Sequence, residues 1–431
     1  MLAKITVELD GQVVGVVERE LSGAAAAIEE DIRRLHQRTG RIMLEPALQQ
    51  IADQTHAPCC CGHTMKNCGR RAIGVHSTFG EIPVERRRYR CLKCGHEAYP
   101  ADAQYCCGHH HLTRPLAQRI CQLATVEHFT RLPGLVAAQH GVTLCHETIW
   151  DLVHEVGTAA DERRQAEAKP AMQRRIAPPA ERPAPKTIYV TCDGIMYCTN
   201  LTEPHPDDPA RQRLTWQQMK VGCVYWQDEK ERWHKQMTWG RESPEEFGAA
   251  LWRLACQCGY QQAQETIFAA DGGSWCWDIH ARYFGEATGI LDWYHASEHV
   301  WDAAKQVAPL DSKAWANAAI DQLRAGGGAA LLTWLKSSPA ACSDSARAAR
   351  EELINYIATK VDLMNYPDCR GHGWQIGTGM VESTCKQLVG IRLKGPGMHW
   401  SEKGALAVTA LRAIDFNGKW NSYWNTLILS A

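Results

Sequence analysis

The sequence predicts an α/β fold, and the middle of the chain contains the three observations behind this prediction. A β-branched run, TIYVTCDGIMYC at 187–198, predicts a buried strand that carries Asp193. Two strand-like segments, TWQQMKVGCVYW and RWHKQMTWG, follow and are separated by the turn-like DEKE. After a helix at about 244–256, ETIFAADGGSWCWDIH passes from a short apolar strand through Asp271 into glycines and a second helix. Strands that alternate with helices in this way predict a sheet covered by helices.

The next segments extend this order to a recognisable architecture. GILDWYHASEHVWDAAK predicts another strand that runs into a helix, with Asp292 and His295 at the junction. Residues 308–345 contain a triple-glycine break and a helical LLTWLK, so we expect a helical insertion there. The whole order matches a ribonuclease-H-like, retroviral-integrase-like catalytic core, in which carboxylates from the central strand and its neighbour lie side by side and a later helix brings in a third.

The third acid is expected in IGTGMVESTCKQLVGIRLKG at 376–395. Glu382 lies there between a glycine-broken entry and a run of cations, on a predicted helix. An acid beside cations has a second interpretation, a surface helix with a Glu-to-Lys pair four residues apart. Glycines near the cations permit close approach of a DNA backbone, which favours DNA contact over a solvated face. The cations assigned to this contact are Lys386, Arg392, Lys394 and Lys403.

Asp193, Asp271 and Glu382 together suit a two-metal site. Two divalent ions bridged by one aspartate can activate a water molecule or a DNA 3′-hydroxyl and stabilise the leaving oxygen of an in-line displacement. Oxygen ligands select Mg²⁺ or Mn²⁺, so we expect two such ions. A lone Asp-Gly more often begins a tight turn, and it is the second strand-end acid, Asp271, that favours the catalytic interpretation of Asp193.

Cysteines predict a second metal site, of structural type. The chain has 19 cysteines, an odd and scattered set that suits a reducing compartment with some metal-bound thiolates. Cys91 and Cys94 form C-x-x-C-G, and Cys59 with Cys61 precede Gly62, so these four could bind zinc around a strand-turn-strand ribbon. The compressed first knuckle leaves its ligands open, and ordinary buried thiols are the competing interpretation. The potential substitutes are Cys68, Cys106, Cys107, His63 and His96.

A helical DNA-binding region is expected from Leu112 onward. Two short helices joined through glycine, the second at about 145–156, are compatible with a helix-turn-helix. Plain packing of a small helical bundle is an equally good interpretation, since the second helix carries three acids. The backbone contacts would come from Arg114, Arg119 and Arg131.

The remaining segments and the bulk composition set limits on the class of protein. We expect a hairpin at 4–17, helices at 21–38 and 43–52, and an extended, Pro- and Arg-rich linker at 158–186. A formal net charge of −1 gives no overall basic field, so DNA binding must rest on local patches. Neither a signal peptide nor a long apolar run is evident, which predicts a cytoplasmic, nucleoid-associated protein without membrane contact.

The motifs as a set resemble the DDE transposases of bacterial insertion sequences, most closely the ISKra-type family. They are the C-x-x-C knuckle, CDG, WQQMKVG, ADGGSW, LDWYHASEH, GMVESTCKQLVGIRLKGPGMHW and the tail KWNSYW. The resemblance implies Asp193, Asp271 and Glu382 as the catalytic triad and Asp292 with His295 as a D-x-x-H element. It also implies double-stranded DNA partners, namely terminal inverted repeats and target DNA, and a homodimer or higher oligomer on DNA. The compressed zinc knuckle departs from the family pattern.

Three functions remain open at this point: an active transposase, a nuclease of the same fold without strand transfer, and an inactive DNA-binding regulator. His295 is treated either as a catalytic group that holds a carboxylate or phosphate or as a satisfied structural histidine. The expected domains follow the segments above. They are 1–55, hairpin and helices; 56–108, zinc ribbon; 109–160, helical DNA-binding; 161–186, linker; 187–307 with 346–415, catalytic core; 308–345, helical insertion; and 416–431, C-terminal tail.

Overall fold

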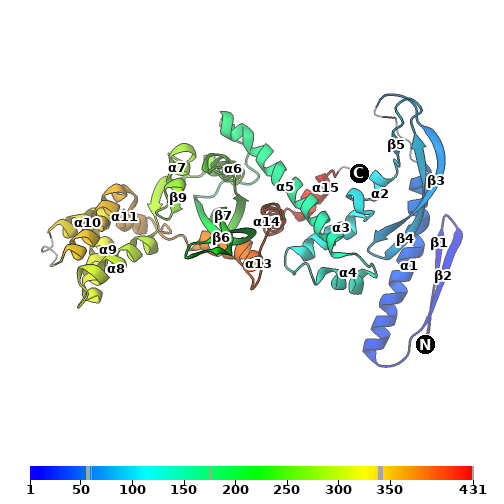
Figure 1. Cartoon of the computed structure of the whole chain (residues 1–431), viewed down its shortest axis with the longest axis horizontal. Coiled ribbons are helices and arrows are strands. Elements are labelled where there is room, and N and C mark those ends of the chain that lie inside the picture. Colours follow the sequence, from blue (N-terminus) through cyan, green and yellow to red (C-terminus); the bar gives the residue numbers. More distant parts are fainter. Residues whose placement is uncertain (55–58, 60, 175, 338–342, 430–431) are drawn as a thin grey trace. The chain divides into compact units, whose positions relative to one another are not determined.

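The computed structural model describes residues 1–54, 59, 61–174, 176–337 and 343–429. It divides into two compact units, Met1–Ala159 with Lys419–Ala431, and Ala160–Gly418. Both units combine sheets with helices, so the chain has a mixed α/β fold (Figure 1). Within the described ranges, no helix combines the length and the apolar character that a membrane crossing requires.

The first unit begins with the predicted hairpin. Strands β1 (Leu2–Leu9) and β2 (Gln12–Glu20) pair antiparallel. Between them, Asp10 and Gly11 adopt φ angles of 50° and 76°, the left-handed conformation that a two-residue hairpin turn requires. The Asp-Gly pair thus explains both the position and the tightness of this turn.

A long helix covers the second sheet of this unit. The sheet has the order β3-β4-β5, with strands Lys66–Ser77, Gly80–Arg90 and Glu97–Ala98. Helix α1 (Ala25–Gln54) replaces the two shorter helices that the sequence predicted, and its residue Leu48 packs with Val75 and Ile82 of the sheet. Gly40 lies within the helix because the Phe79 ring occupies the space of a side chain there. Packing against the sheet therefore outweighs the low helix propensity of glycine.

Four helices and a C-terminal helix complete the first unit. They are α2 (Asp102–Tyr105), α3 (Arg114–Ala124), α4 (Leu132–His140), the start of α5 (His146–Arg174) and α15 (Trp420–Thr426). The Arg114 guanidinium donates to the carbonyls of Trp424 and Leu427 at 2.8 and 3.0 Å. The Tyr423 hydroxyl donates to the Val156 carbonyl at 2.6 Å. The C-terminal segment is therefore a structural part of this unit.

The second unit is built on a five-stranded sheet of order β10-β9-β6-β7-β8. The strands β6, β7 and β8 form an antiparallel meander, and β9 and β10 add parallel to β6 on its other side. Their bounds are β6 Thr187–His205, β7 Asp208–Gln227, β8 Trp233–Gly240, β9 Glu265–Ala270 and β10 Thr288–Leu291. The predicted strands are all present, although β6 and β7 continue further than their apolar patterns indicate.

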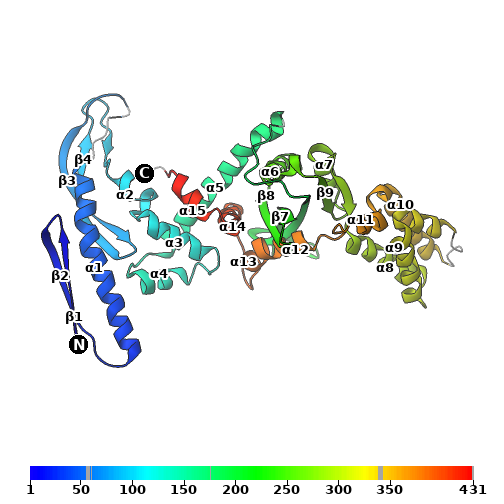
Figure 2. The same ribbon diagram turned by 180° about the vertical axis from the view of Figure 1, so that it is seen from behind.

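Helices cover this sheet and form a separate cluster beyond β10. Helices α6 (Pro244–Gln257) and α7 (Ser274–Tyr283) pack on one face around a core that includes Phe247, Phe268 and Ile279. Both views show α8 to α11 side by side (Figure 2). The remaining bounds are α8 Trp293–Val307, α9 Ser312–Ser337, α10 Asp344–Thr359, α11 Tyr366–Gly371, α12 Gly379–Cys385, α13 Ile391–Leu393 and α14 Glu402–Phe416.

The predicted glycine break at 326–328 is a kink inside α9, where Gly327 has a φ of 68°. The segment expected as an extended linker is also different, because α5 continues through most of it to Arg174. Arg164 pairs with Asp161 at 3.0 Å and with Glu242 at 2.7 Å, and Trp239 donates to Asp161 at 3.0 Å. These buried polar contacts hold the helix in place, and the polar composition alone could not indicate them.

Candidate active site and metal centre

The strand register brings two of the predicted acids together. Thr191 of β6 pairs with Ala269 of β9 in parallel register. Asp193 and Asp271 each follow two residues later, so they lie side by side and on the same face. Asp271 comes directly after β9 because the pairing stops there, and the backbone turns through Gly272 and Gly273 into α7.

A third acid, directly after β10, is aligned with this pair. Asp193 itself lies within β6, which continues to His205, so the expectation that it ends a strand is wrong. Leu291 of β10 pairs with Ala270 of β9, and the Asp292 N–H donates to the Ala270 carbonyl at 2.8 Å. Asp292 is 2% exposed and caps α8, with the His295 N–H donating to its Oδ1 at 2.6 Å. Asp292 therefore occupies this position for two reasons: it directly follows the last residue of β10, and its side chain caps the first turn of α8.

The electrostatics of Asp193 reflect a crowded acidic site. Burial raises the pKa of Asp193, and the charges of Asp271 and Glu382 raise it further, against the opposing effect of a hydrogen bond from the Gly194 N–H. That hydrogen bond is 2.6 Å long. Cys385 points its Sγ toward Asp193 Oδ2 at 3.8 Å. Acids that repel one another at a partly buried position are typical of sites that bind cations.

Glu382 enters the site from α12 and is held through Thr378. The Thr378 N–H and hydroxyl donate to Asp292 Oδ2 at 2.5 and 2.6 Å, and the same hydroxyl lies 3.0 Å from Glu382 Oε1. Lys235 on β8 holds α12 and the turn that follows it by donating to Thr384 Oγ1 and Gln387 Oε1 at 3.2 and 3.0 Å. Asp292, Thr378 and Glu382 thus form one chain of polar contacts.

His295 lies over the glycine that follows Asp271. A Cβ on Gly272 would come within 2.9 Å of His295 Nε2 and within 3.1 Å of the Tyr356 hydroxyl. The His295 ring also meets His299 edge-on at 4.9 Å between centroids, and burial lowers the pKa of His299. A side chain at position 272 would require the His295 ring to shift, which gives a physical reason for the glycine in ADGG.

Two cavities meet at the acids. One of about 500 Å³ is lined by Asp193, Asp271 and Glu382, together with Asp292, Tyr294, His295, Glu298 and Thr378. The second, of about 480 Å³, also contains Asp193 and Glu382 but is otherwise lined by Lys386, Lys394 and small or apolar groups. An acidic chamber therefore adjoins a cationic one, and two acids belong to both.

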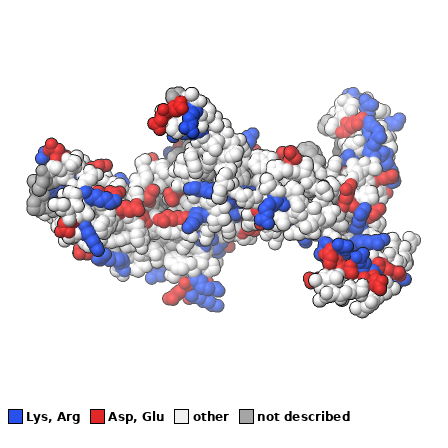
Figure 3. All heavy atoms as spheres, turned by 60° about the horizontal axis from the view of Figure 1, so that its bottom comes forward, with Lys and Arg blue, Asp and Glu red and all other residues white. Residues whose placement is uncertain are grey.

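Three of the four predicted cations near Glu382 are exposed, namely Lys386, Lys394 and Lys403. Arg392 differs from the expectation of DNA contact, because it is 2% exposed and its guanidinium lies 4.9 Å over the Trp400 ring. The short helix α13 turns it inward, and charge pattern alone does not indicate that. Over the face in Figure 3, cationic and anionic side chains intermingle, in keeping with the net charge of −1.

The four predicted zinc ligands converge at one end of the β3-β4 hairpin. The sulfurs of Cys59, Cys61, Cys91 and Cys94 all lie within 4.8 Å of one another. Three of the separations are 3.4, 3.4 and 3.6 Å, for the pairs Cys59–Cys94, Cys59–Cys61 and Cys61–Cys91. A tetrahedral zinc site with Zn–S bonds of about 2.3 Å needs sulfurs about 3.8 Å apart. The four thiols therefore could bind zinc.

The geometry favours thiolate at one of the four cysteines. Backbone N–H groups of Cys94 and Lys93 lower the pKa of Cys91 to about 6, whereas burial and the neighbouring sulfurs raise the pKa of Cys59 and of Cys61 against the effect of backbone hydrogen bonds. Among the side chains that the structure describes, these cysteines form the one metal-binding group whose ligand atoms are so close, so the carboxylates of the active site surround a wider space. Of the substitutes considered, His63 places Nδ1 3.6 Å from Cys61 Sγ.

The arginines assigned to the helix-turn-helix differ in their surroundings. Helices α4 and α5 are joined through Gly141, which has a φ of 65°. Arg131 pairs with Glu127 at 2.9 Å, and Arg119 is exposed. Arg114 departs from the expectation, because its guanidinium is engaged by the carbonyls of the C-terminal segment.

Sequence reasoning missed the residues that support the acids. Thr378, Tyr294 and Cys385 contribute to the site but gave no signal as single residues. A threonine four residues before Glu382 at the start of a helix was the available indication for Thr378, since residues i and i+4 share a helix face. Tyr294 is 69% exposed beside the cavity, which only the fold reveals.

Comparisons with known proteins add little to this geometry. A scan against protein-family models and a search of curated proteins found no match. Among solved structures, the Drosophila P element transposase strand transfer complex is similar over 73% of this chain and 80% of that chain, at 8% identity and a TM-score of 0.23. A similarity at this score carries no argument.

Proposed function

We propose that this chain is a DNA transposase of the DDE class, in which Asp193, Asp271 and Glu382 form the catalytic triad. The observation that carries the proposal is the shared cavity of about 500 Å³, where Asp193 within β6 and Asp271 directly after β9 meet Glu382 from α12. The sheet order β10-β9-β6-β7-β8, with three antiparallel and two parallel strands, supports a ribonuclease-H-like core.

The donor set suits magnesium or manganese. Carboxylate oxygens are the ligands that these ions prefer, and Asp193, Asp271 and Glu382 would hold them. Bound divalent ions supply Lewis-acid stabilisation of an in-line displacement at phosphorus. The raised pKa of Asp193 supports this assignment, since clustered carboxylates lose their mutual repulsion when cations bind.

The proposed reaction has two displacements. In the first, the oxygen of water bonds to phosphorus and the bond from phosphorus to O3′ breaks. This leaves a 3′-hydroxyl on one fragment of the cut strand and a 5′-phosphate on its other fragment. In the second, that 3′-hydroxyl attacks a phosphodiester of target DNA, whose own O3′ leaves. Lys386 and Lys394, in the adjoining chamber, are positioned to neutralise phosphates of the strand next to the reacting one.

The zinc ribbon and the DNA-binding role of the first unit belong to the same proposal. The β3-β4 hairpin with Cys59, Cys61, Cys91 and Cys94 at one end supports a structural zinc site. Terminal inverted repeats and target DNA are the proposed partners. A homodimer or higher oligomer that pairs two DNA ends, and membership of the ISKra-type family, remain proposals from the sequence motifs.

The test is cleavage and joining of a labelled duplex in Mg²⁺. Asp193→Asn, Asp271→Asn and Glu382→Gln are each expected to abolish both products, whereas Glu298→Gln should leave them unchanged. Glu298 is the matched control because it lines the same cavity with a side chain that is 78% exposed. Full activity in any triad variant would refute the catalytic assignment.

Two other outcomes separate the alternatives. Cleavage without joining to a target identifies a nuclease of the same fold, and DNA binding without either product identifies an inactive regulator. The exposure of the cavity and the presence of all three acids favour the active enzyme over the regulator. A joined product that depends on a free 3′-hydroxyl identifies a transposase.

A further inference from the structure

A further cavity lies in the first unit, away in sequence from the acids. It has a volume of about 810 Å³ and lies between α1 and the tip of the β3-β4 hairpin. Three arginines of α1 line it, Arg34, Arg38 and Arg41, and the facing side includes Glu81 and His140. We refer to this cavity as the α1 groove.

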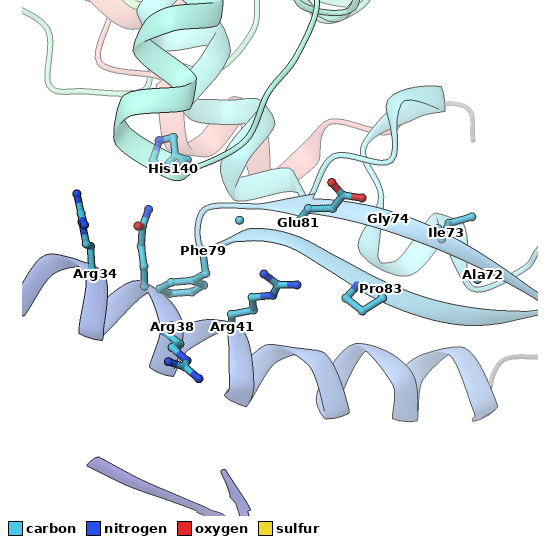
Figure 4. A pocket seen from close by; sticks show the side chains of 13 residues that line it. Arg34, Arg38, Arg41, Ala72, Ile73, Gly74, Phe79, Glu81, Pro83 and His140 are labelled. Carbon is cyan, nitrogen blue, oxygen red and sulfur yellow. The ribbon is translucent and has the colours of Figure 1, made fainter. Parts of the chain in front are cut away.

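The arginines follow the axis of one helix. Arg34 and Arg41 are seven residues apart, two helical turns, so they project from the same side of α1. At 1.5 Å per residue they extend over about 10.5 Å. Figure 4 shows Arg41 reaching into the space between α1 and the hairpin and Arg34 projecting on the side of His140, while Arg38 leaves the helix on the other side.

Two of these cations lack the acidic partners that most arginines of this unit have. Among the described residues, Arg38 and Arg41 are exposed and make no ion pair or side-chain hydrogen bond. Arg34 pairs with Glu30 at 2.8 Å, but Glu30 is shared with Arg33 at 2.7 Å. The groove therefore has a surplus of positive charge, although the whole chain has a net charge of −1.

We infer that the α1 groove binds the sugar-phosphate backbone of DNA. One strand of B-DNA presents a phosphate about every 3.4 Å along the axis, so the distance of about 10.5 Å from Arg34 to Arg41 corresponds to about three phosphate intervals. Arginine is suited to this ligand because its planar guanidinium binds phosphate oxygens in a bidentate manner. The choice of DNA rests on the proposed function, whereas the phosphodiester chemistry rests on the groove itself.

The shape of the groove supports a backbone rather than a base as its ligand. Its floor combines apolar and backbone surface, with Ile73, Pro83 and Phe79 next to Gly80. Gly80 has a φ of 110° and no side chain, and a Cβ there would meet no atom closer than 3.9 Å. Deoxyribose rings can pack against this apolar surface while the phosphates face the arginines. Contacts of this kind position DNA without reading its sequence.

The test measures binding of the full-length protein to a fluorescent random-sequence DNA duplex, at several salt concentrations and without added magnesium. Each phosphate contact contributes about 0.9 to the slope of log affinity against log salt. Arg41→Gln is expected to lower this slope by about 0.9, and Arg38→Gln by less, because Arg38 leaves α1 on the other side. The double variant should weaken binding between about 5- and 60-fold at 0.1 M salt.

A charge change of the opposite sign sharpens the test. Glu81 is the acid that faces the arginines, so Glu81→Gln should tighten binding several-fold with little change in volume. Arg19→Gln is the matched control, since Arg19 belongs to the same unit, is already paired with Asp31 at 2.5 Å and does not line the groove. It should leave the slope unchanged.

Unchanged affinity and slope in the Arg38/Arg41 double variant would overturn the inference, as would an equal loss in Arg19→Gln. Tighter binding to an RNA duplex than to the DNA duplex would overturn the assignment to DNA. Because no cleavage is measured, the groove can fail while the triad variants behave as proposed, and the reverse. Circular dichroism of each variant excludes unfolding as the cause of a loss.

Discussion

Thr378→Val tests whether Asp292 acts through Thr378 on Glu382, the acid from α12 in the proposed triad. The substitution replaces a hydroxyl by a methyl group of similar shape. It keeps the Thr378 N–H that donates to Asp292 Oδ2 at 2.5 Å but removes the hydroxyl donor at 2.6 Å, which also lies 3.0 Å from Glu382 Oε1. Asp292 retains two donors, so the site should fold.

The size of the effect follows from the charge of the acceptor. A hydrogen bond to a charged group is worth about 1.5–3 kcal/mol, and Asp292 is 2% exposed, so water cannot replace the lost donor. We expect a stability loss of about 1.5 kcal/mol, at the lower end because two donors remain. Partners that orient metal ligands typically change metal affinity or activity by 10- to 100-fold.

The assay is a magnesium titration of DNA cleavage, together with a melting curve. Thr378→Val should raise the magnesium concentration for half-maximal activity by about 10- to 100-fold. Thr378→Ser keeps the hydroxyl and should behave as the unmodified protein. A Thr378→Val protein with the unmodified magnesium response, or a Thr378→Ser protein with the same defect as Thr378→Val, would refute the role of the hydroxyl.

Three further predictions concern stability. Burial raises the pKa of Asp193 above 3.8, so its contribution to stability is fully present below that pH and is lost as the pH rises through the pKa of the folded state. Asp193→Asn should therefore raise the melting temperature at pH 7 in the absence of metal. It should also reduce the increase in melting temperature that Mg²⁺ produces. Cys91→Ser should lose one equivalent of zinc by metal analysis and lower the melting temperature of the first unit, whereas Cys68→Ser, outside the sulfur cluster, should retain both. Arg164→Ala should lower the free energy of unfolding by about 3–5 kcal/mol in urea titrations, because it leaves Asp161 and Glu242 buried without their cation, whereas Arg163→Ala at an exposed pair should cost less than about 1 kcal/mol.

Asp271 could be located from sequence because a hydrophobic run and two glycines mark where β9 stops. Asp193 also follows a hydrophobic run, but β6 continues past it to His205, and parallel pairing of β6 with β9 brings the two acids together. Cys91 and Cys94 likewise have a spacing that local chain geometry enforces. Features of this kind depend on neighbours in the sequence, which is why they are readable there.

Contacts between distant segments were not readable in this way. Whether Arg392 faces solvent or the Trp400 ring depends on how α13 sits in the fold, and both alternatives have the same local pattern. The same holds for Arg164, whose partners include Glu242, 78 residues away in the sequence. Polar composition predicted a linker there, and buried ion pairing made a helix.

The placement of α15 has a consequence for the order in which the protein forms. Residues from 419 onward belong to the first unit, yet a ribosome makes them after all of the second unit. Until then, Arg114 lacks the carbonyls of Trp424 and Leu427, and Val156 lacks the Tyr423 hydroxyl. Domains generally fold as units during synthesis. The second unit can therefore complete its core before the first, which remains unfinished until residues 419–427 have emerged from the ribosome.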